Sequence, residues 1–285
     1  MQAGGKNVVP VTTPLHQELY SGAMRSENGS LSFWRCRIMQ SPVVQSTASV
    51  GEIVAEYPNT SNLFKEYRID FCCGGGRPLS EVLAESGLDE PAFLERLNAI
   101  VEASNRTPRT DIDWRTYESG QLMRHIQDTH HAFLRSELPV LHEFVTKIKN
   151  VHGLRHPELV ELHTLYTSMR AELEEHLVQE EERVFPLILE YERTGEEALK
   201  RRAGETIAVL EADHSRVGEI LREMRRVTAD YTLPEGACRT YTVSFQKLVQ
   251  LESDLFEHIH LENNILFPRF EEHCSCGEEK GGMGQ

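Results

Sequence analysis

The sequence HLVQEEERVFP at residues 176–186 returns in similar form as HIHLENNILFP at residues 258–268. Both stretches follow the pattern His-x3-Glu-x4-Phe-Pro. A histidine and a glutamate four residues apart project from one face of a helix, and a single pair of this kind is usually an ordinary surface feature. Because the pair occurs twice and ends each time at Phe-Pro, the repeat predicts two similar halves with the same function.

Four long stretches surround the repeat, each with apolar residues every three or four positions. They cover residues 119–149, 157–192, 196–228 and 235–271. A stripe of this kind is typical of the buried face of a packed helix. No stretch shows the clean alternation that predicts a strand. With short connections between the helices, the pattern predicts an all-α protein whose main part is a four-helix bundle.

Each of the four predicted buried faces carries a histidine, and two of them add a glutamate one turn later. The spacing selects six residues: His131, His176, Glu180, His214, His258 and Glu262. The lone histidine precedes the His-Glu pair by 45 residues in the first half and by 44 in the second. His130 competes with its neighbour, but the spacing prefers His131. His260 is expected to point away from the core.

Imidazole and carboxylate groups together suit iron, manganese and zinc. Six such groups suffice for two ions if both glutamates bridge them, and positions remain open for a small molecule. The alternative is a set of hydrogen-bonded core histidines. That alternative would leave buried charges uncompensated, at a cost of several kcal/mol each. The pattern therefore favours a metal site. Glu172 and Asp254 precede His176 and His258 by four residues and are expected either to accept the second N–H of these histidines or to line a path to the site.

Residues 46–105 predict a small helical domain made of short amphipathic segments separated by Pro and Gly. Within it, YRIDFCCGGG at residues 67–76 places Cys72 and Cys73 side by side before three glycines. Two exposed thiols would suit redox chemistry or a soft metal. The alternative is a pair of inert small residues in a tight turn.

The remaining segments carry weaker patterns. Residues 1–45 are rich in small and polar residues and are expected to form a disordered leader, with Met39 as an alternative natural start. Residues 106–118 are expected to link the small domain to the bundle at 119–272. Residues 273–285 are expected to form a flexible tail that contains Cys274 and Cys276.

Composition excludes several classes of protein. The formal net charge of -15 disfavours binding to nucleic acid or to an anionic membrane. No apolar run reaches the length of a membrane-spanning helix, and no secretory signal is recognisable. The six cysteines are poorly spaced for a disulfide framework, which favours reduced thiols and a cytoplasmic protein.

The YRIDFCCGGG segment, followed by a bundle with HLVQEEERVFP and HIHLENNILFP, resembles the repair-of-iron-centres proteins, a di-iron iron–sulfur cluster repair family. The resemblance covers about residues 47–272. It implies a hemerythrin-like bundle that holds two non-haem irons, bridged by carboxylates and by an oxo group, on the six residues selected above. It also implies that Cys72 and Cys73 are the family's vicinal cysteines. The leader and Cys274-Ser-Cys276 depart from the family pattern, and His152 matches a histidine of uncertain role.

The resemblance therefore implies a stress-response protein that repairs iron–sulfur clusters after damage by nitric oxide or oxidants, by supplying iron. Damaged iron–sulfur proteins would be its clients, nitric oxide or oxygen its small ligands, and a homodimer would be compatible with the family. Cys72 and Cys73 would accept iron or electrons, or contact the client. Two alternatives stay open, namely a module that binds or senses nitric oxide or oxygen, and a nitric oxide reductase.

Overall fold

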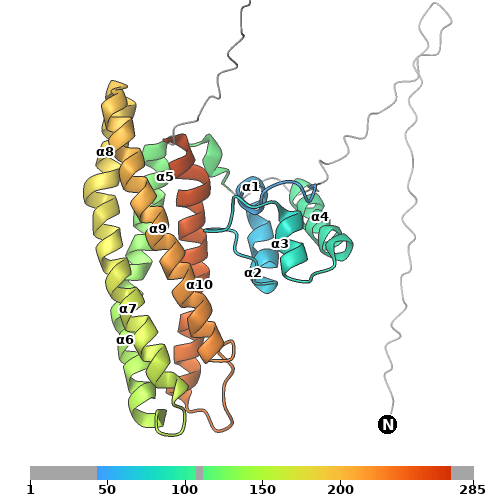
Figure 1. Ribbon diagram of the computed structural model, residues 1–285, viewed down its shortest axis with the longest axis vertical. Helices are drawn as coiled ribbons and strands as arrows, with labels where there is room; N and C mark the ends of the chain where they lie inside the picture. Colours follow the sequence, from blue (N-terminus) through green and yellow to red (C-terminus); the bar gives the residue numbers. More distant parts are fainter. Residues whose placement is uncertain (1–43, 107–111, 271–285) are drawn as a thin grey trace, which may run out of the picture. The chain divides into compact units, whose positions relative to one another are not determined.

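The computed structural model describes residues 44–106 and 112–270 of the chain. In these ranges the chain is helical and contains no strand, apart from one isolated bridge between Ser49 and Pro78 (Figure 1). The predicted all-α fold is thereby confirmed. The expectations for the leader up to residue 43, for residues 107–111 of the linker, and for Cys274 and Cys276 in the tail concern residues outside these ranges.

Four helices make up the small N-terminal part: α1 Val50–Glu56, α2 Ser61–Glu66, α3 Leu79–Glu85 and α4 Glu90–Arg106. Helix α1 begins at Ser49, whose side chain caps the helix while Glu52 reaches back to the Ser49 amide. This reciprocal arrangement satisfies amide groups that the first helical turn leaves without partners. A buried cluster of Phe64, Phe71 and Phe93 joins the helices, with ring centroids 5.7 and 6.3 Å apart.

Six helices form the bundle: α5 Ser119–Ile126, α6 Ala132–His152, α7 Glu158–Gln179, α8 Phe185–Thr194, α9 Glu197–Val227 and α10 Arg239–Leu261. Helix α6 packs against α7 and α10, and α7 packs against α9. Short connections between α6 and α7, and between α8 and α9, make these neighbours antiparallel (Figure 1). The apolar stripes predicted from the sequence face one another in this core.

Three of the four predicted long helices are interrupted, whereas α9 is continuous. A five-residue π-helical turn occupies Gln127–His131, another Glu180–Val184, and a third Glu262–Leu266. In the second and third cases the turn precedes Pro186 or Pro268, which have no N–H to continue the α-helical pattern. The predicted helical stretches are present, and the apolar spacing gave no indication of these turns. Such π-helical turns are rare, and they occur often at functional sites.

The small helical part contacts the bundle through α10 and α9. Lys65 donates hydrogen bonds to Ser253 and Glu257, and the ring of Phe71 packs edge-on against Phe256, 5.8 Å away. On the α9 side, Arg222 lies 3.7 Å from Asp70. These contacts hold the segment that carries the vicinal cysteines against the bundle.

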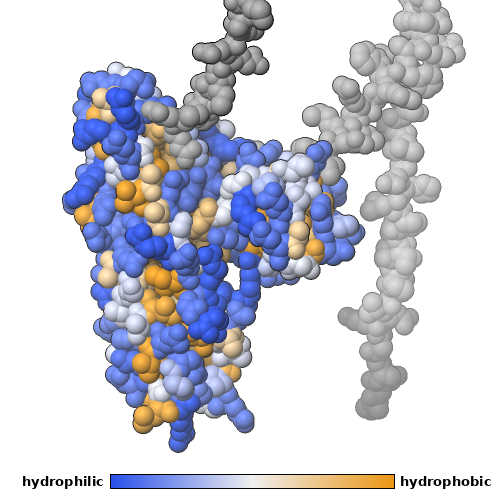
Figure 2. All heavy atoms as spheres, viewed as in Figure 1, coloured by the Kyte–Doolittle hydropathy of each residue, from blue (hydrophilic) through white to orange (hydrophobic). Residues whose placement is uncertain are grey.

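The outer surface of the described helices is mostly hydrophilic in Figure 2, with scattered hydrophobic residues along the bundle. Within residues 44–106 and 112–270, no helix is both long enough and apolar enough to cross a membrane.

Candidate metal centre

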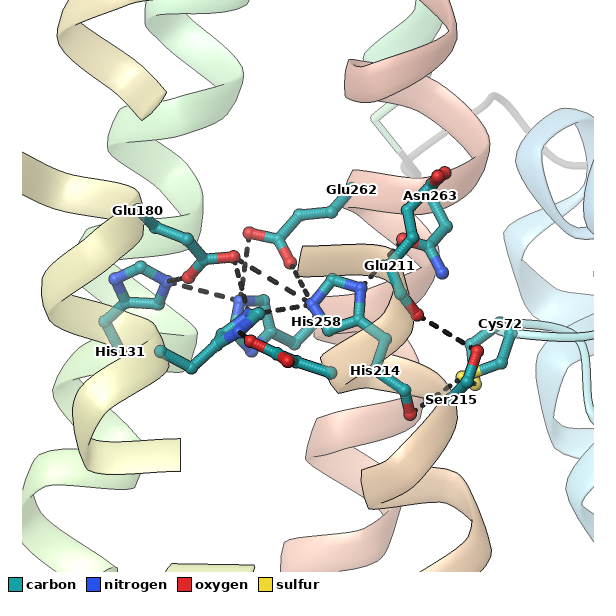
Figure 3. Close-up of polar contacts among 12 residues, drawn as sticks. Cys72, His131, Glu180, Glu211, His214, Ser215, His258, Glu262 and Asn263 are labelled. Carbon is teal, nitrogen blue, oxygen red and sulfur yellow. Dashed lines mark hydrogen bonds and ion pairs between the residues drawn. The ribbon is translucent and has the colours of Figure 1, made fainter. Parts of the chain in front are cut away.

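Six buried side chains meet in the bundle core, and they are the six that the sequence spacing selects (Figure 3). They come from four helical segments that lie side by side. Each is at most 3% exposed: His131, His176, Glu180, His214, His258 and Glu262. The structure therefore brings the predicted set together, although the six residues span 132 positions of the chain.

The six side chains divide into two groups of four ligand atoms, and both glutamates belong to both groups. One oxygen of Glu180 lies 3.2 Å from His131 Nε2, and the other lies 2.9 Å from His176 Nε2. Glu262 behaves in the same way, with one oxygen 3.2 Å from His258 Nε2 and the other 3.3 Å from His214 Nε2. Each carboxylate thus spans the space between the two groups.

The glutamate oxygens have no other partner. All four carboxylate oxygens of Glu180 and Glu262 are buried, and none forms a hydrogen bond of good geometry; their close contacts are the histidine nitrogens. Two buried carboxylates that only imidazole rings balance are costly, whereas a cation among these nitrogens and oxygens would stabilise them. The donor set therefore fits metal ions, and specifically those that accept mixed nitrogen and oxygen ligands.

The charges of the cluster balance in pairs. Burial by itself lowers the pKa of His176, but the charge of Glu180 outweighs it and raises that pKa to about 9. Burial likewise raises the pKa of Glu180, and the neighbouring His176 outweighs it and holds that pKa well below its usual value. At His258 burial prevails, and the pKa is lowered. Protons on histidines thus offset ionised carboxylates, and a bound cation can take their place.

The residue directly after each bridging glutamate orients the lone histidine of its half. Glu181 accepts a hydrogen bond of 2.7 Å from His131 Nδ1, and Asn263 accepts one of 2.8 Å from His214 Nδ1. An acceptor at Nδ1 fixes the ring so that Nε2 faces the cluster. The sequence interpretation missed both residues, although they occupy equivalent positions in the two copies of the repeat.

The predicted acceptors for the other two histidines were wrong. His176 Nδ1 lies 3.4 Å from Asp213, which is on α9, while Glu172 lies 3.7 Å from Arg216 instead. Asp254 accepts a hydrogen bond of 2.9 Å from His130, and Nδ1 of His258 has no hydrogen-bond partner. A spacing of four residues on one helix placed these acids near the histidines, but neighbouring helices supply the actual contacts.

Two further histidines border the centre without joining it. His130 stacks in parallel on His258 at a centroid distance of 5.5 Å and, unlike His131, belongs to neither group of ligand atoms. His260 points toward the small helical part, where its Nδ1 lies 3.3 Å from the carbonyl oxygen of Phe71. Burial lowers the pKa of His260 to about 4, which leaves the ring neutral.

The vicinal cysteines lie against the same centre, on its α9 side. Cys73 Sγ lies 3.3 Å from the backbone oxygen of His214, and 3.7 Å from Cys72 Sγ (Figure 3). The Cys72 thiol also contacts Asp70 at 3.2 Å, so that Asp70 and the two cysteines form a third group able to hold a metal. This proximity joins residues 141 positions apart.

The π-helical turn after His258 holds the cysteine loop in place. Asn264 donates hydrogen bonds to the carbonyl oxygens of Phe71 and Cys72 at 3.3 and 3.1 Å. A Cβ atom at Gly75 would lie 2.3 Å from the Asn264 side chain and 2.7 Å from the Phe71 carbonyl, so the close approach requires glycine there. Of the two asparagines after Glu262, Asn263 therefore contacts His214 of the cluster, and Asn264 contacts the cysteine loop.

The expectation of two exposed thiols was wrong for Cys72, which is only 3% exposed. Burial raises the pKa of Cys72 well above its usual value, and the hydrogen bond with Cys73 and the charge of Asp70 act in the same direction. Cys73 is half-buried. The pair is thus a partly covered site in this conformation.

Changing the acceptors at Nδ1 should weaken metal binding without removing a ligand. We expect Glu181→Ala and Asn263→Ala each to lower metal affinity by about 10–100-fold, because the lone histidine loses its fixed orientation. Competition with a chromophoric chelator measures the effect. Glu182→Ala, which changes an exposed neighbour, provides the control. Unchanged affinity in both acceptor variants would contradict the orienting role.

Family models match both parts of the chain. Residues 46–101 match ScdA_N, described as a domain of unknown function (DUF542), and residues 122–270 match the hemerythrin HHE cation binding domain. The second match covers the whole metal cluster, so iron binding is the property that the hemerythrin-like domain implies for these residues.

Similar curated proteins match most of this chain over nearly their own full length. The chain is 33% identical over 228 residues to the iron–sulfur cluster repair protein ScdA of Staphylococcus haemolyticus, a match that covers 80% of this chain and 100% of that protein. It is 34% identical over 220 residues to the iron–sulfur cluster repair protein YtfE of an Enterobacter species, covering 77% and 94% of the two chains. The chain therefore belongs to the family of iron–sulfur cluster repair proteins, in which an ScdA_N domain precedes a hemerythrin HHE cation-binding domain.

Proposed function

We propose that this protein repairs iron–sulfur clusters damaged by nitric oxide or oxidants, and that it does so by supplying iron. The observation that carries the proposal is the pair of four-atom groups that share Glu180 and Glu262. The similarity to the iron–sulfur cluster repair proteins ScdA and YtfE supports the same conclusion. The clients would be iron–sulfur proteins of the cytoplasm.

The arrangement suits two iron ions. His131 and His258 would hold one ion, His176 and His214 the other, and the two glutamates would bridge them. Two protein nitrogens and two shared carboxylates leave coordination positions open on each ion, which is what small ligands such as nitric oxide or oxygen require. An ion with open coordination positions has fewer protein ligands than one in a closed structural site, and this favours the release of iron.

The cysteine loop lies between His214 and a cavity beside the bundle. A cavity of about 540 Å³ is lined by Cys72, Cys73, Ser215 and Asn263, among others. Asn263 contacts His214 from one side, and Cys73 contacts the His214 backbone from the other. Iron leaving the His214 side would therefore meet the group formed by Asp70 and the thiols. The Asp70 carboxylate is placed to accept the thiol proton as Cys72 takes up the metal.

Transfer of labelled iron tests the proposal. The protein is loaded with ⁵⁷Fe and incubated without oxygen with an iron–sulfur enzyme whose cluster nitric oxide has destroyed. We expect the enzyme to regain activity with ⁵⁷Fe in its cluster, seen by Mössbauer spectroscopy, and more rapidly than with the same amount of free iron.

The alternatives give different results in the same experiment. Steady production of nitrous oxide in the presence of an electron donor, with no label in the enzyme, would identify a reductase. Reversible gas binding with neither label transfer nor nitrous oxide would identify a gas carrier or sensor. Either result would overturn the repair proposal.

A further inference from the structure

A cysteine and a histidine meet at the end of the bundle where α6 joins α7 and α9 joins α10 (Figure 1). His152 is the last residue of α6, and Cys238 directly precedes the first residue of α10. Their side chains come together across 86 positions of sequence, with Nε2 of His152 3.2 Å from Sγ of Cys238. The thiol is exposed and forms no disulfide. The repair function described above does not use this pair.

The surroundings hold the imidazole and the thiol in position. The His152 ring packs against Tyr241, one turn into α10, with centroids 5.4 Å apart. The connection before Cys238 is anchored by Tyr231, which is buried against Phe245 and whose amide donates to Thr228 Oγ1 at 3.0 Å. Cys238 itself is the N-cap residue of α10, where its carbonyl oxygen accepts a hydrogen bond of 3.1 Å from the Thr242 amide, so the backbone that carries the thiol is fixed.

Both helix ends favour charge separation within the pair. The C-terminal end of a helix interacts favourably with a cation, and the N-terminal end with an anion. His152 lies at the C-terminal end of α6, and Cys238 lies at the N-terminal end of α10 with Arg239 beside it. Transfer of the thiol proton to the imidazole would therefore place each charge at the helix end that stabilises it.

The pair does not extend to a metal site. The neighbouring His156 has its ring 6.5 Å from that of His152 and contacts Glu158 instead, at 3.0 Å. Within the described ranges, no third histidine, cysteine or carboxylate lies close enough to Cys238 to complete a set of ligands. A thiol with a base within reach, and without metal ligands around it, is suited to nucleophilic attack.

We propose that Cys238 is a reactive thiol that exchanges with low-molecular-weight disulfides such as glutathione disulfide, with His152 as the base. The imidazole takes the proton from Sγ, and the thiolate attacks one sulfur of the disulfide. A bond forms between Cys238 and that sulfur, the original disulfide bond breaks, and the second sulfur leaves as a thiolate that takes up the proton. The product is a mixed disulfide on the protein, which a free thiol reverses.

This modification site is separate from the metal centre. His131 and His152 lie 21 residues apart on one helical segment, which corresponds to about 30 Å at 1.5 Å per residue. Cys238 would thus become modified when small thiols are oxidised, and this modification would not depend on iron in the bundle. Failure of the repair proposal would leave this inference intact, and the reverse is also true.

The rate of mixed-disulfide formation tests the proposal. The full-length protein is incubated with glutathione disulfide, and digestion with mass spectrometry follows the added glutathione on the peptide that contains Cys238. We expect this residue to react faster in the folded protein than in the same chain unfolded in urea. His152→Gln should slow the reaction at Cys238 by at least about tenfold, because the base is lost.

His156→Gln is the matched control, since it changes the adjacent imidazole that contacts Glu158 and not the thiol. It should leave the rate at Cys238 unchanged. Far-ultraviolet circular dichroism confirms that both variants remain helical. A wild-type rate in His152→Gln would overturn the proposal, and so would a rate in the folded protein no higher than in urea.

Discussion

Replacing Glu180 by alanine is expected to remove both metal ions from the bundle and to leave its helices folded. Glu180 contributes one oxygen to each group of ligands, so a single substitution takes an anionic ligand from both. The remaining set would hold its ions with one negative charge in place of two, and a cation buried among histidines depends on such charges. Glu262→Ala should have the same effect, because its two oxygens are shared in the same way.

Metal analysis after purification, together with circular dichroism, measures this result. Glu182→Ala is the control, since Glu182 belongs to the same π-helical turn as Glu180 but its side chain is exposed. It should retain the full metal content. If Glu180→Ala and Glu262→Ala both kept two ions per chain, the bridging arrangement would be refuted. Loss of one ion only would show that each glutamate serves a single site.

The double substitution Cys72→Ala and Cys73→Ala is expected to abolish iron transfer to a damaged client while the bundle keeps its iron. The two sulfurs and Asp70 form the group next to His214, so their removal eliminates the acceptor but no ligand of the bundle centre. Alanine fills most of the space of the buried Cys72 side chain and adds no polar atom, which limits the loss of stability.

Cys238→Ala is the matched control for this experiment, because it removes a thiol at one end of the bundle, away from the Cys72–Cys73 loop that contacts the middle of α9. The ⁵⁷Fe transfer assay should give wild-type transfer for Cys238→Ala and only the level of free iron for the double variant, with equal iron content in both. Full transfer by the double variant would exclude the thiols from the path. It would leave direct release from the bundle as the route.

The periodicity of the sequence was enough to predict the helical fold and the metal-ligand candidates. A spacing of three or four residues fixes which side of a helix a residue occupies, so the apolar stripes and the histidines within them identify one inward face. The repeat His-x3-Glu-x4-Phe-Pro added the second half of the centre. For this reason the six residues of the cluster were named before any contact between helices was known.

The secondary contacts could not be predicted in the same way. Glu172 and Asp254 were expected near His176 and His258 because they lie one turn away on the same helix. In the structure Asp213 of α9 lies near His176, and Asp254 accepts a hydrogen bond from His130. Both acids lie on the same helix as the histidine they were assigned to, but side chains from neighbouring helices make the contacts. Spacing on one helix therefore does not determine which acid meets which ring.

The helical bundle and the inward face of its histidines and glutamates follow from the residue pattern, because both depend on the helical repeat alone. Three features depend instead on the packing of the folded chain: each carboxylate spans two groups of ligands, the Cys72–Cys73 loop lies against His214, and His152 contacts Cys238. These contacts join residues far apart in the chain. Their geometry depends on how helices and loops pack against one another, which no local pattern of residues specifies.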